Sequence, residues 1–437
     1  MSLVPLTGSA GSEVAAAGSG PPPNNEAAIL VTVRVRPFNA KELALMAPPA
    51  TGRFTFGSQP AAATTTGGNQ KAMRKVVHVI DERILVFDPP EDQANARFAR
   101  SAPPAQTGKR HKDVRFAFDR VFNEDATQQE VYVGTTQSLI DAVLNGFNAT
   151  VFAYGATGCG KTHTISGIPS DPGIIFLTMK ELFEKINASE HEQIVEAAMS
   201  YLEVYNETIR DLLVGEGMPS PPLALREDAK KGVIVAGLSE HIPTKVEDVM
   251  ELVLLGNKNR TQSPTEANAT SSRSHAVLQV HIRRKSRVGG LSSDVTSATL
   301  SLIDLAGSER ASVTQNRGDR LLEGANINRS LLALANCINA LCDDKKKRHI
   351  PYRDSKLTRL LKFSLGGNCK TVMIVCCSPA STYFEETYNT LKYANRAKNI
   401  KTKVEQNTVN VKAHVSQYVK QIKEQSEIIK RLQAENA

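Results

Sequence analysis

A glycine-rich turn that leads into Lys161 and Thr162 carries the strongest chemical signal in the sequence. Residues 155–162 read GATGCGKT and fit the phosphate-loop pattern GxxxxGK[ST]. The apolar run 150–154 precedes the turn and helix-compatible sequence follows it, so the order is the strand, turn and helix that this motif requires. The alternative is a chance glycine turn. Glycines let backbone N–H groups curl around phosphate oxygens at the positive end of a helix dipole. We therefore expect Lys161 to reach the β- and γ-phosphates of a nucleotide, and the Thr162 hydroxyl to bind Mg²⁺.

A second candidate site lies at the end of the run 297–303 (SATLSLI), which is typical of a buried strand. The run ends on Asp304, and Gly307 follows three residues later. P-loop nucleotide hydrolases hold Mg²⁺ with an aspartate at such a strand end, and a glycine placed like Gly307 can donate its N–H to a γ-phosphate. Alone, the pattern is equally typical of an ordinary turn. Beside the phosphate loop, it favours a nucleotide site.

A third candidate is the stretch 268–275 (NATSSRSH), just before a predicted strand over 276–285. Here several hydroxyl groups, including those of Ser271 and Ser272, crowd ahead of Arg273. Such a set can donate to a γ-phosphate, its metal and an attacking water. A serine-rich stretch alone is most often a solvated loop.

The rest of the sequence predicts a frame that brings these loops together. Apolar, β-branched runs alternate with stretches at helical spacing. We expect strands over residues 28–37, 76–88, 114–122, 195–205, 209–213, 276–285, 297–304 and 372–377. We expect helices over residues 127–145, 177–186, 246–259, 326–341 and 356–364. This alternation predicts a layered α/β domain, with helices on both faces of one sheet.

Composition limits the class of protein. The chain has 437 residues, 41% hydrophobic and 22% charged, which is ordinary for a globular protein. No apolar run approaches the ~20 residues that span a membrane and no secretory signal is evident, so we expect no membrane partner. Six cysteines without regular spacing indicate free thiols in a reducing compartment. The net charge of +8 favours an acidic partner, which could be nucleic acid, an anionic membrane or a protein surface.

In four places the sequence resembles the kinesin motor superfamily. The stretches 155–164 (GATGCGKTHT), 268–275 (NATSSRSH) and 304–309 (DLAGSE) occur in the family's order, after RVRP at 34–37. Further signatures are VYNE at 204–207, EGANIN at 323–328 and YNTLKYA at 388–394. The resemblance covers about residues 28–400. It implies a P-loop motor domain with a central mixed sheet that binds ATP and Mg²⁺, and whose ATP hydrolysis is stimulated by microtubules.

The resemblance also implies roles for single residues at the nucleotide. Arg34, Arg36 and Pro37 would frame the adenine together with His163. The residues that would surround the phosphates are Gly155, Ala156, Thr157, Gly158, Cys159, Gly160, Lys161 and Thr162.

Two switch loops would sense the γ-phosphate. We call residues 268–275 the first switch and 304–309 the second switch. Ser271 and Ser272 would act from the first switch and Gly307 from the second. Thr162 and Ser272 would bind Mg²⁺, with Asp304 acting through water. A salt bridge between Arg273 and Glu309 would close the switches over ATP and position the hydrolytic water.

A basic segment follows the helix predicted over 326–341. Its residues are Lys345, Lys346, Lys347, Arg348, Arg353 and Lys356. A charge run is most often a solvated face, but the resemblance implies that this one meets the acidic tails of tubulin. Nucleic acid would suit the charge equally well. We do not expect it as a partner, because no aromatic stacking platform interleaves the lysines.

The two ends of the chain differ from its middle. Residues 1–27 are rich in Gly, Ser, Ala and Pro and are expected to be disordered. Polar insertions are expected near 48–71 and 89–113. By resemblance, 401–413 would form a neck linker and 414–437 a neck helix. Its apolar positions keep coiled-coil spacing around a polar Gln425, so we expect a homodimer in the full-length protein, although a single amphipathic helix is the alternative.

Within the superfamily, residues 81–89 (DERILVFDP) with the basic insertion after them, and residues 407–419, are similar to the eighth kinesin class. Members of that class step toward plus ends and shorten microtubule ends. We expect the protein in the cytoplasm and on the cytoskeleton, with the mitotic spindle and nucleus as further places.

Two other functions are alternatives to a motor. A nucleotide-independent microtubule-binding module would need damaged switches, and a soluble P-loop phosphotransferase would need an acceptor pocket. A GTPase would carry NKxD, whereas residues 257–260 read NKNR, so we do not expect guanine recognition.

Overall fold

Strand β7 (Ala149–Tyr154) lies in the middle of the sheet, and all of its residues are buried. It pairs in parallel with β15 (Ser292–Asp304) on one side and with β16 (Lys370–Cys377) on the other. Apolar, β-branched runs suit this position because both faces of a central parallel strand are covered. The phosphate loop leaves the carboxyl end of β7, so the predicted site is anchored to the centre of the fold.

The computed structural model describes residues 26–46, 73–88, 114–215, 221–228, 232–261, 272–287, 292–309, 319–343, 349–412 and 415–435. The expected N-terminal tail up to residue 25, the bodies of both expected insertions, Ser271 and the basic run 345–348 lie outside these residues.

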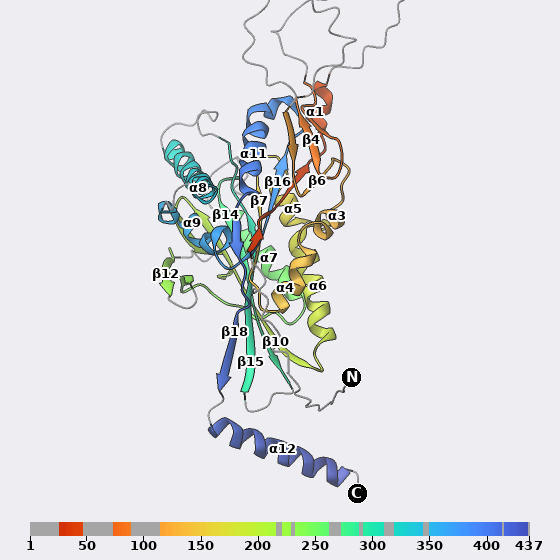
Figure 1. Cartoon of the computed structure of the whole chain (residues 1–437), viewed down its shortest axis with the longest axis vertical. Coiled ribbons are helices and arrows are strands. Elements are labelled where there is room, and N and C mark those ends of the chain that lie inside the picture. Colours follow the sequence, from red (N-terminus) through yellow and green to blue (C-terminus); the bar gives the residue numbers. More distant parts are fainter. Residues whose placement is uncertain are drawn as a thin grey trace, which may run out of the picture.

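Around β7 the described residues form a nine-stranded sheet in the order β11–β10–β14–β15–β7–β16–β2–β6, with β18 beside β15 (Figure 1). Four pairs of strands are antiparallel: β11–β10, β10–β14, β14–β15 and β15–β18. The other pairs in this sheet are parallel. The predicted mixed sheet is therefore confirmed. The strands not yet bounded are β2 (Leu30–Val35), β6 (Arg120–Phe122), β10 (Gln193–Tyr205), β11 (Thr208–Asp211), β14 (His275–Ser286) and β18 (Thr408–Lys412).

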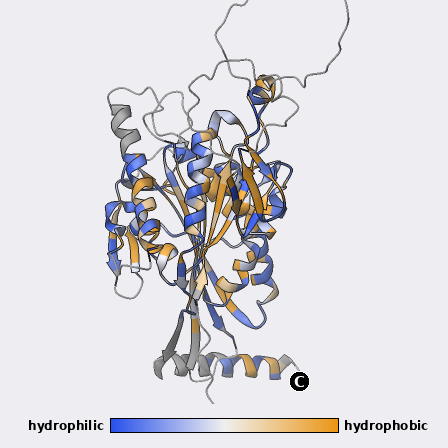
Figure 2. Cartoon of the chain, turned by 45° about the horizontal axis from the view of Figure 1, so that its top comes forward, coloured by the Kyte–Doolittle hydropathy of each residue, from blue (hydrophilic) through white to orange (hydrophobic). Residues whose placement is uncertain are grey.

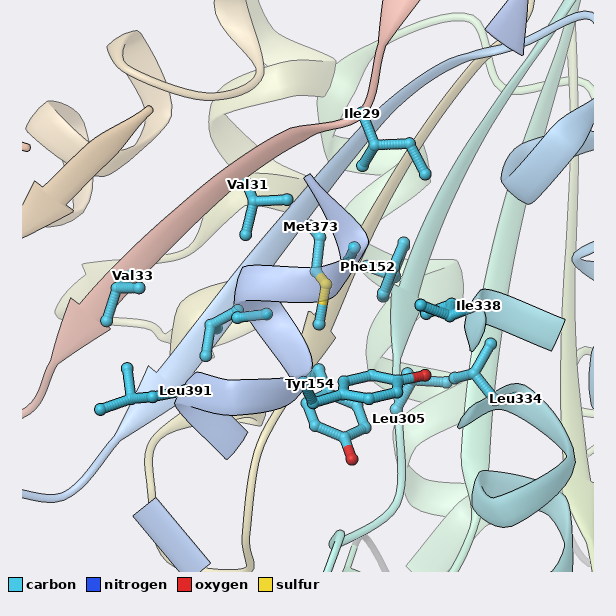
Figure 3. Close-up of a cluster of buried hydrophobic side chains, with 14 of the residues drawn as sticks. Ile29, Val31, Val33, Phe152, Tyr154, Leu305, Leu334, Ile338, Met373 and Leu391 are labelled. Carbon is cyan, nitrogen blue, oxygen red and sulfur yellow. The ribbon is translucent and has the colours of Figure 1, made fainter. Parts of the chain in front are cut away.

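Side chains alternate between the two faces of the sheet, as the period of a strand requires. In β7, Phe152 and Tyr154 point into one hydrophobic cluster, while Val151 and Ala153 point into another. The first cluster contains side chains from α8 (Asp319–Leu341), α9 (Lys356–Leu360) and α11 (Phe384–Ala397), and Figure 3 shows part of it around Met373 and Leu334. The second contains side chains from α4 (Gln137–Leu144), α6 (Ile174–Ala188) and α7 (Val246–Thr261). Helices thus cover both faces, as predicted.

Two predicted helices are broken in the structure. The helix expected over 127–145 is divided into α3 (Gln128–Val133) and α4, because α3 ends at Gly134. The helix expected over 356–364 is divided into α9 and α10 (Lys362–Gly366), with Leu361 between them. Helices α6 and α8 begin before their predicted starts, at Ile174 and Asp319. The remaining short helices are α1 (Ala40–Leu45) and α5 (Lys161–Ile165).

Two predicted strands also divide. Residues 114–122 form β5 (Val114–Ala117) and β6, and only β6 joins the main sheet. Strand β5 instead pairs with β4 (Ile84–Phe87), which pairs with β3 (Val77–Val79) in the hairpin expected over 76–88. A hairpin of β12 (Ala224–Asp228) and β13 (Gly232–Ala236), and the short pair β8 (Gly167–Ile168) and β9 (Asp171–Pro172), were not predicted.

The two ends of the described chain meet. Strand β1 (Glu26–Ala28) pairs antiparallel with β17 (Lys401–Lys403), so regular structure begins inside the segment expected to be disordered. The residues expected to form the neck linker are not a free linker in this structure, because β17 and β18 both pair with strands of the motor domain.

Helix α12 (Val415–Glu435) follows below the sheet (Figure 1). The part of α12 that Figure 2 colours contains both hydrophilic and hydrophobic residues, and about half of the surface of Ile428, Ile429 and Leu432 is exposed. No helix in the described part of the chain is long and apolar enough to cross a membrane.

Candidate functional site

The three predicted loops meet beyond the carboxyl ends of β7 and β15. These strands are parallel neighbours, and Asp304 stands in register with Ala153. The second switch then bonds to both other loops: the Gly307 N–H donates to the Ser272 carbonyl at 2.9 Å, and the Ser308 N–H donates to the Gly155 carbonyl at 3.1 Å. The structure therefore joins in one place three stretches that are far apart in the sequence.

The phosphate loop has the backbone that its glycines predict. Gly155, Gly158 and Gly160 all have positive φ, and Gly160 is the N-cap of α5. A side chain at Gly155 would collide with the carbonyl oxygen of Cys376 on the neighbouring strand. Lys161 is buried, and its ammonium donates to the Ala156 carbonyl at 3.0 Å, inside the curve of the loop. A glycine-rich turn of this kind can present backbone N–H groups to an anion, and Lys161 adds a positive charge beside them.

Cys159 lies in the same loop and is buried. Burial raises the pKa of its thiol to about 11. A thiol that stays protonated is a poor nucleophile, so the structure favours a packing role for Cys159 over a reactive one.

Two of the predicted metal-binding residues are in direct contact. The Thr162 hydroxyl donates to Asp304 Oδ2 at 2.8 Å, and the second carboxylate oxygen, Oδ1, is buried without a hydrogen-bond partner. A hydroxyl and a carboxylate are the hard oxygen donors that suit Mg²⁺. Within the described ranges, no group of three or more His, Cys, Asp or Glu residues could hold a metal. Mg²⁺ usually takes one or two protein oxygens together with water and substrate phosphates, and Thr162 and Asp304 offer such oxygens.

The residue that holds Asp304 was not predicted. Arg260, at the end of α7, donates from Nη1 to Asp304 Oδ2 at 2.9 Å. It also donates from Nε and Nη2 to the hydroxyl and carbonyl of Ser274, at 3.0 and 2.8 Å. Burial is the largest influence and lowers the pKa of Arg260, but the charge and hydrogen bond of Asp304, together with the charges of Tyr201 and Glu203, outweigh it and raise that pKa. Arg260 thus fastens the first switch to the second through a buried ion pair.

Glu309 contacts the phosphate loop. Its carboxylate accepts from the Thr157 N–H at 2.9 Å and from the Thr157 hydroxyl at 2.5 Å. A side chain at Gly307 would collide with the side chains of Thr157 and Glu309, so the contact between these two residues as it stands needs a glycine at this position. The expected salt bridge between Arg273 and Glu309 stays a prediction.

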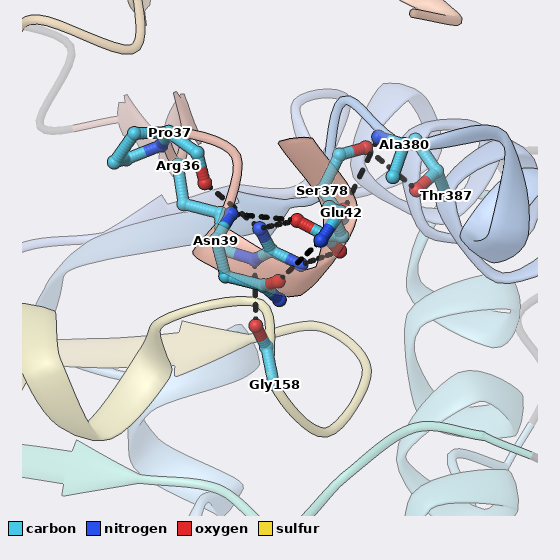
Figure 4. A network of polar contacts seen from close by, with 8 residues as sticks. All are labelled: Arg36, Pro37, Asn39, Glu42, Gly158, Ser378, Ala380 and Thr387. Carbon is cyan, nitrogen blue, oxygen red and sulfur yellow. Dashed lines mark hydrogen bonds and ion pairs between the residues drawn. The ribbon is translucent and has the colours of Figure 1, made fainter. Parts of the chain in front are cut away.

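Arg36 supports the phosphate loop from outside (Figure 4). Its Nε donates to the Gly158 carbonyl at 2.7 Å, and its two Nη atoms form a bidentate pair with Glu42 at 2.7 and 2.6 Å. Glu42 also caps α1 in a capping box with Asn39. The hydrogen bond from Arg36 holds the pKa of Glu42 below its ordinary value. Arg36 Nη1 also donates to the carbonyl of Pro37 at 2.8 Å, so this end of the RVRP stretch is fixed at the edge of the loop.

Arg34 and His163 lie on either side of Gln128, a residue that the sequence analysis did not single out. Arg34 Nη1 donates to Gln128 Oε1 at 2.7 Å and to the Thr164 hydroxyl at 2.9 Å. Gln128 Nε2 in turn donates to the His163 carbonyl at 2.7 Å and lies 3.2 Å from the ring Nδ1. Burial, then the charge of Arg34, lowers the pKa of His163. A neutral, half-exposed imidazole suits contact with a flat apolar ring, and the adenine role of these residues stays a prediction.

The family profile of the kinesin motor domain matches residues 60–400. The chain belongs to this family. Among its relatives, Kinesin-like protein 6 of Schizosaccharomyces pombe is 56% identical over 93% of the chain. Kinesin-like protein KIP3 of Saccharomyces cerevisiae is 56% identical over 83%, and Kinesin-like protein KIF18A of Mus musculus is 50% identical over 89%. These relatives are members of the eighth kinesin class, which confirms the class that the sequence resembles.

The chain spans about half the length of these relatives: 53%, 48% and 41%. Among solved structures, a fast kinesin has a TM-score of 0.71 and 34% identity, with 87% of this chain and 94% of that one covered. A KIF14 dimer with AMP-PNP on a microtubule also has a TM-score of 0.71 and 34% identity, with 87% and 96% covered. The kinesin fold expected from the sequence is thus confirmed.

The predicted microtubule side of this kinesin fold lies around α8, α9 and the β12–β13 hairpin, at the left of Figure 1. The Arg353 side chain is 78% exposed and lies 3.5 Å from Glu227 of β12. Lys356 begins α9, whose start is held by Glu207: the carboxylate accepts from the Ser355 hydroxyl at 2.6 Å and from the Lys356 N–H at 2.8 Å. The VYNE signature thus positions α9.

Proposed function

We propose that the protein is a microtubule-based motor that hydrolyses ATP and is stimulated by microtubules. The observation that carries this proposal is the joining of three loops by two backbone hydrogen bonds, Gly307 to Ser272 and Ser308 to Gly155. A γ-phosphate bound at such a junction would contact all three loops at once. Hydrolysis and phosphate release would then change the contacts of both switches, as in other nucleotide switches.

The residues at the junction suit phosphoryl transfer, which depends mostly on positioning and charge stabilisation. Lys161 and the loop N–H groups would hold the phosphates, and Gly307 would donate its N–H to the γ-phosphate. Thr162 and Ser272 would hold Mg²⁺, with Asp304 acting through water. When bound, that ion neutralises charge on the phosphate oxygens. Arg273 and Glu309 would close the switches, with Ser271 contributing from the first.

Two observations favour a motor over the other functions weighed from the sequence. A nucleotide-independent binding module would not need the switch contacts, yet Arg260, Gly307 and Glu309 make them through buried or charged groups. A soluble phosphotransferase would not need basic residues here, whereas Arg353 is exposed just before α9 and the basic run 345–348 follows α8 in the sequence. Charge of this sign suits the acidic surface of tubulin.

We further propose that the protein steps toward plus ends and shortens microtubule ends, on the cytoskeleton of the cytoplasm and, in dividing cells, on the spindle and in the nucleus. The class of its relatives supports this, as do the basic residues of the insertion 89–113. We also propose that the full-length protein is a homodimer, since α12 exposes apolar side chains at coiled-coil spacing.

The test of motor function compares ATP turnover with and without stabilised microtubules. We expect strong stimulation that falls when Lys345, Lys346 and Lys347 are neutralised, with a larger deficit at low salt because exposed charges act over about 10 Å at 0.1 M salt. A matched control neutralises three exposed lysines elsewhere: Lys180, Lys245 and Lys285. Equal effects of the two variants would show that only net charge matters, and absent stimulation of the unaltered chain would refute the motor assignment.

End shortening is tested separately, by replacing residues 89–113 with a short Gly/Ser linker. The insertion precedes the phosphate loop by more than forty residues, so we expect basal ATP turnover to be retained. We expect stabilised microtubules to shorten more slowly, because the basic residues that could hold acidic tubulin are gone. Shortening at the unaltered rate would mean that the insertion is passive.

A further inference from the structure

His275 ends the first-switch motif, and the function proposed above assigns it no task. It is the first residue of β14 and is only 2% exposed. Its ring lies between the backbone of the second switch and the helix α8. A buried imidazole in a core is often only a packed polar group, so its hydrogen bonds decide what it can do.

Both ring nitrogens of His275 are used, and by different elements. The Ala306 N–H in the second switch donates to Nδ1 at 3.0 Å. On the other side, Nε2 lies 2.8 Å from the hydroxyl of Ser330 in α8. That hydroxyl donates its own proton to the Ile327 carbonyl at 2.7 Å, so it accepts from Nε2–H. The bonding thus assigns the tautomer: Nδ1 accepts and Nε2 donates.

The ring is held neutral in this position. Burial, followed by the positive charges of Arg260 and Lys161, lowers its pKa to about 3. A protonated ring would have two donors and could not accept from Ala306. Neutrality therefore keeps one acceptor facing the second switch and one donor facing α8 at every physiological pH.

The contacts on both sides lead to the two proposed sites. Ala306 directly precedes Gly307, which we assign to the γ-phosphate, and α8 ends at Leu341, a few residues before the basic run 345–348. A shift of the second-switch backbone must either carry the ring and Ser330 with it or leave buried polar groups unpaired, and unpaired buried groups are strongly disfavoured.

We propose that His275 is a positioning residue that couples the second switch to α8 through Ser330, so that the state of the nucleotide site alters the placement of the microtubule-facing helix. The coupling rests on the proposed function, since it needs nucleotide as its input. One side chain with two hydrogen bonds carries the coupling, and its bond to Ser330 can be removed by a substitution in α8, on the side remote from the nucleotide.

The test uses hydrogen–deuterium exchange of the whole chain with and without a non-hydrolysable ATP analogue. In the unaltered protein we expect slower exchange in both the second switch and residues 327–334. In Ser330→Ala we expect the switch to respond and the helix response to be lost. The stimulation of ATP turnover by microtubules should fall at least about fivefold, the lower limit of typical coupling between two sites, with basal turnover retained.

Control variants separate coupling from stability. Ser330→Thr retains the hydroxyl and should rescue both readouts. Ser364→Ala removes the buried hydroxyl of a serine in α10, which lies 2.8 Å from the Thr150 hydroxyl in β7. This variant should lower the melting temperature but leave the helix response to the ATP analogue unchanged. If Ser330→Ala does not fold, His275→Asn serves instead, because its shorter side chain keeps an acceptor near Ala306 but does not reach Ser330.

The outcomes are distinct. A helix response that persists in Ser330→Ala, or that is lost equally in Ser364→Ala, overturns the coupling while the proposed function stands. An unaltered chain that shows no response to the ATP analogue in either segment overturns the proposed function itself, and the coupling with it. Loss in Ser330→Ala with rescue by Ser330→Thr supports both.

Discussion

The buried pair of Arg260 and Asp304 allows a sharp prediction about stability. In Arg260→Met the apolar stem is kept but the guanidinium is lost. Asp304 is then left as a charge that is only 2% exposed, and Ser274 loses two hydrogen bonds. Removing one partner of a buried, hydrogen-bonded ion pair costs about 3–5 kcal/mol. We expect the free energy of unfolding to fall by that amount.

Urea unfolding followed by circular dichroism measures this loss. For a domain of this size we take a slope of about 4 kcal/mol per M urea, so the midpoint should fall by roughly 1 M. Lys180→Met is the control, because it removes an exposed positive charge from another helix, α6. It should change stability by less than about 0.5 kcal/mol.

A double variant tests the cause. Arg260→Met with Asp304→Leu removes both charges, so it should recover part of the stability. ATP turnover should be lost in this variant, because Asp304 is assigned to Mg²⁺. If the free energy of unfolding of Arg260→Met lies within about 1 kcal/mol of that of the unaltered protein, the ion pair does not hold the two switches together.

Three further predictions concern single side chains. Glu309→Ala should bind ATP and microtubules nearly normally but turn over ATP on the order of 10²-fold more slowly, because it removes a group that positions the switches rather than a phosphate ligand; turnover near that of the unaltered protein would exclude this role. The pKa of His275 is near 6.5 in the unfolded state and about 3 in the folded state, so the unfolded state takes up a proton first as the pH falls. The free energy of unfolding should therefore decrease by about 1.4 kcal/mol between pH 8 and 5.5; unfolding curves of His275→Asn should lack this loss. Glu207→Ala frees the start of α9 and should lower the free energy of unfolding by about 1–2 kcal/mol and weaken microtubule binding in a co-sedimentation assay; unchanged values of both would show that α9 needs no such support.

The sequence predicted best what is determined locally. The phosphate loop depends on glycines with positive φ between a buried strand and a helix, and all of these features are visible within about a dozen residues. The alternation of Val151, Phe152 and Ala153 likewise follows from a central strand with both faces covered. The break between α3 and α4 was missed, although the glycine that ends α3, Gly134, is visible in the sequence.

Contacts between distant residues were beyond the reach of sequence patterns. Arg260 belongs to no motif that predicts its role, and its partner Asp304 is 44 residues away. Gln128 likewise carries no motif, yet it joins Arg34 to His163 across 94 and 35 residues. The pairing of β1 with β17 joins a segment whose composition is typical of disorder to the far end of the chain. In each case the deciding interaction exists only after the sheet has formed.

The order of the strands has a consequence for the synthesis of the protein. Strand β16 lies between β7 and β2, but it is translated about 335 residues after β2 ends. At roughly 5–20 residues per second, a ribosome needs about 17–70 s to cover that distance. Through this time β2 and β7 have no strand between them, and the apolar side chains of Val31, Val33 and Phe152 lack the neighbours that bury them. The nascent chain should therefore depend on chaperones that bind exposed apolar segments, and a stop codon anywhere before residue 370 should yield an insoluble product rather than a smaller folded domain.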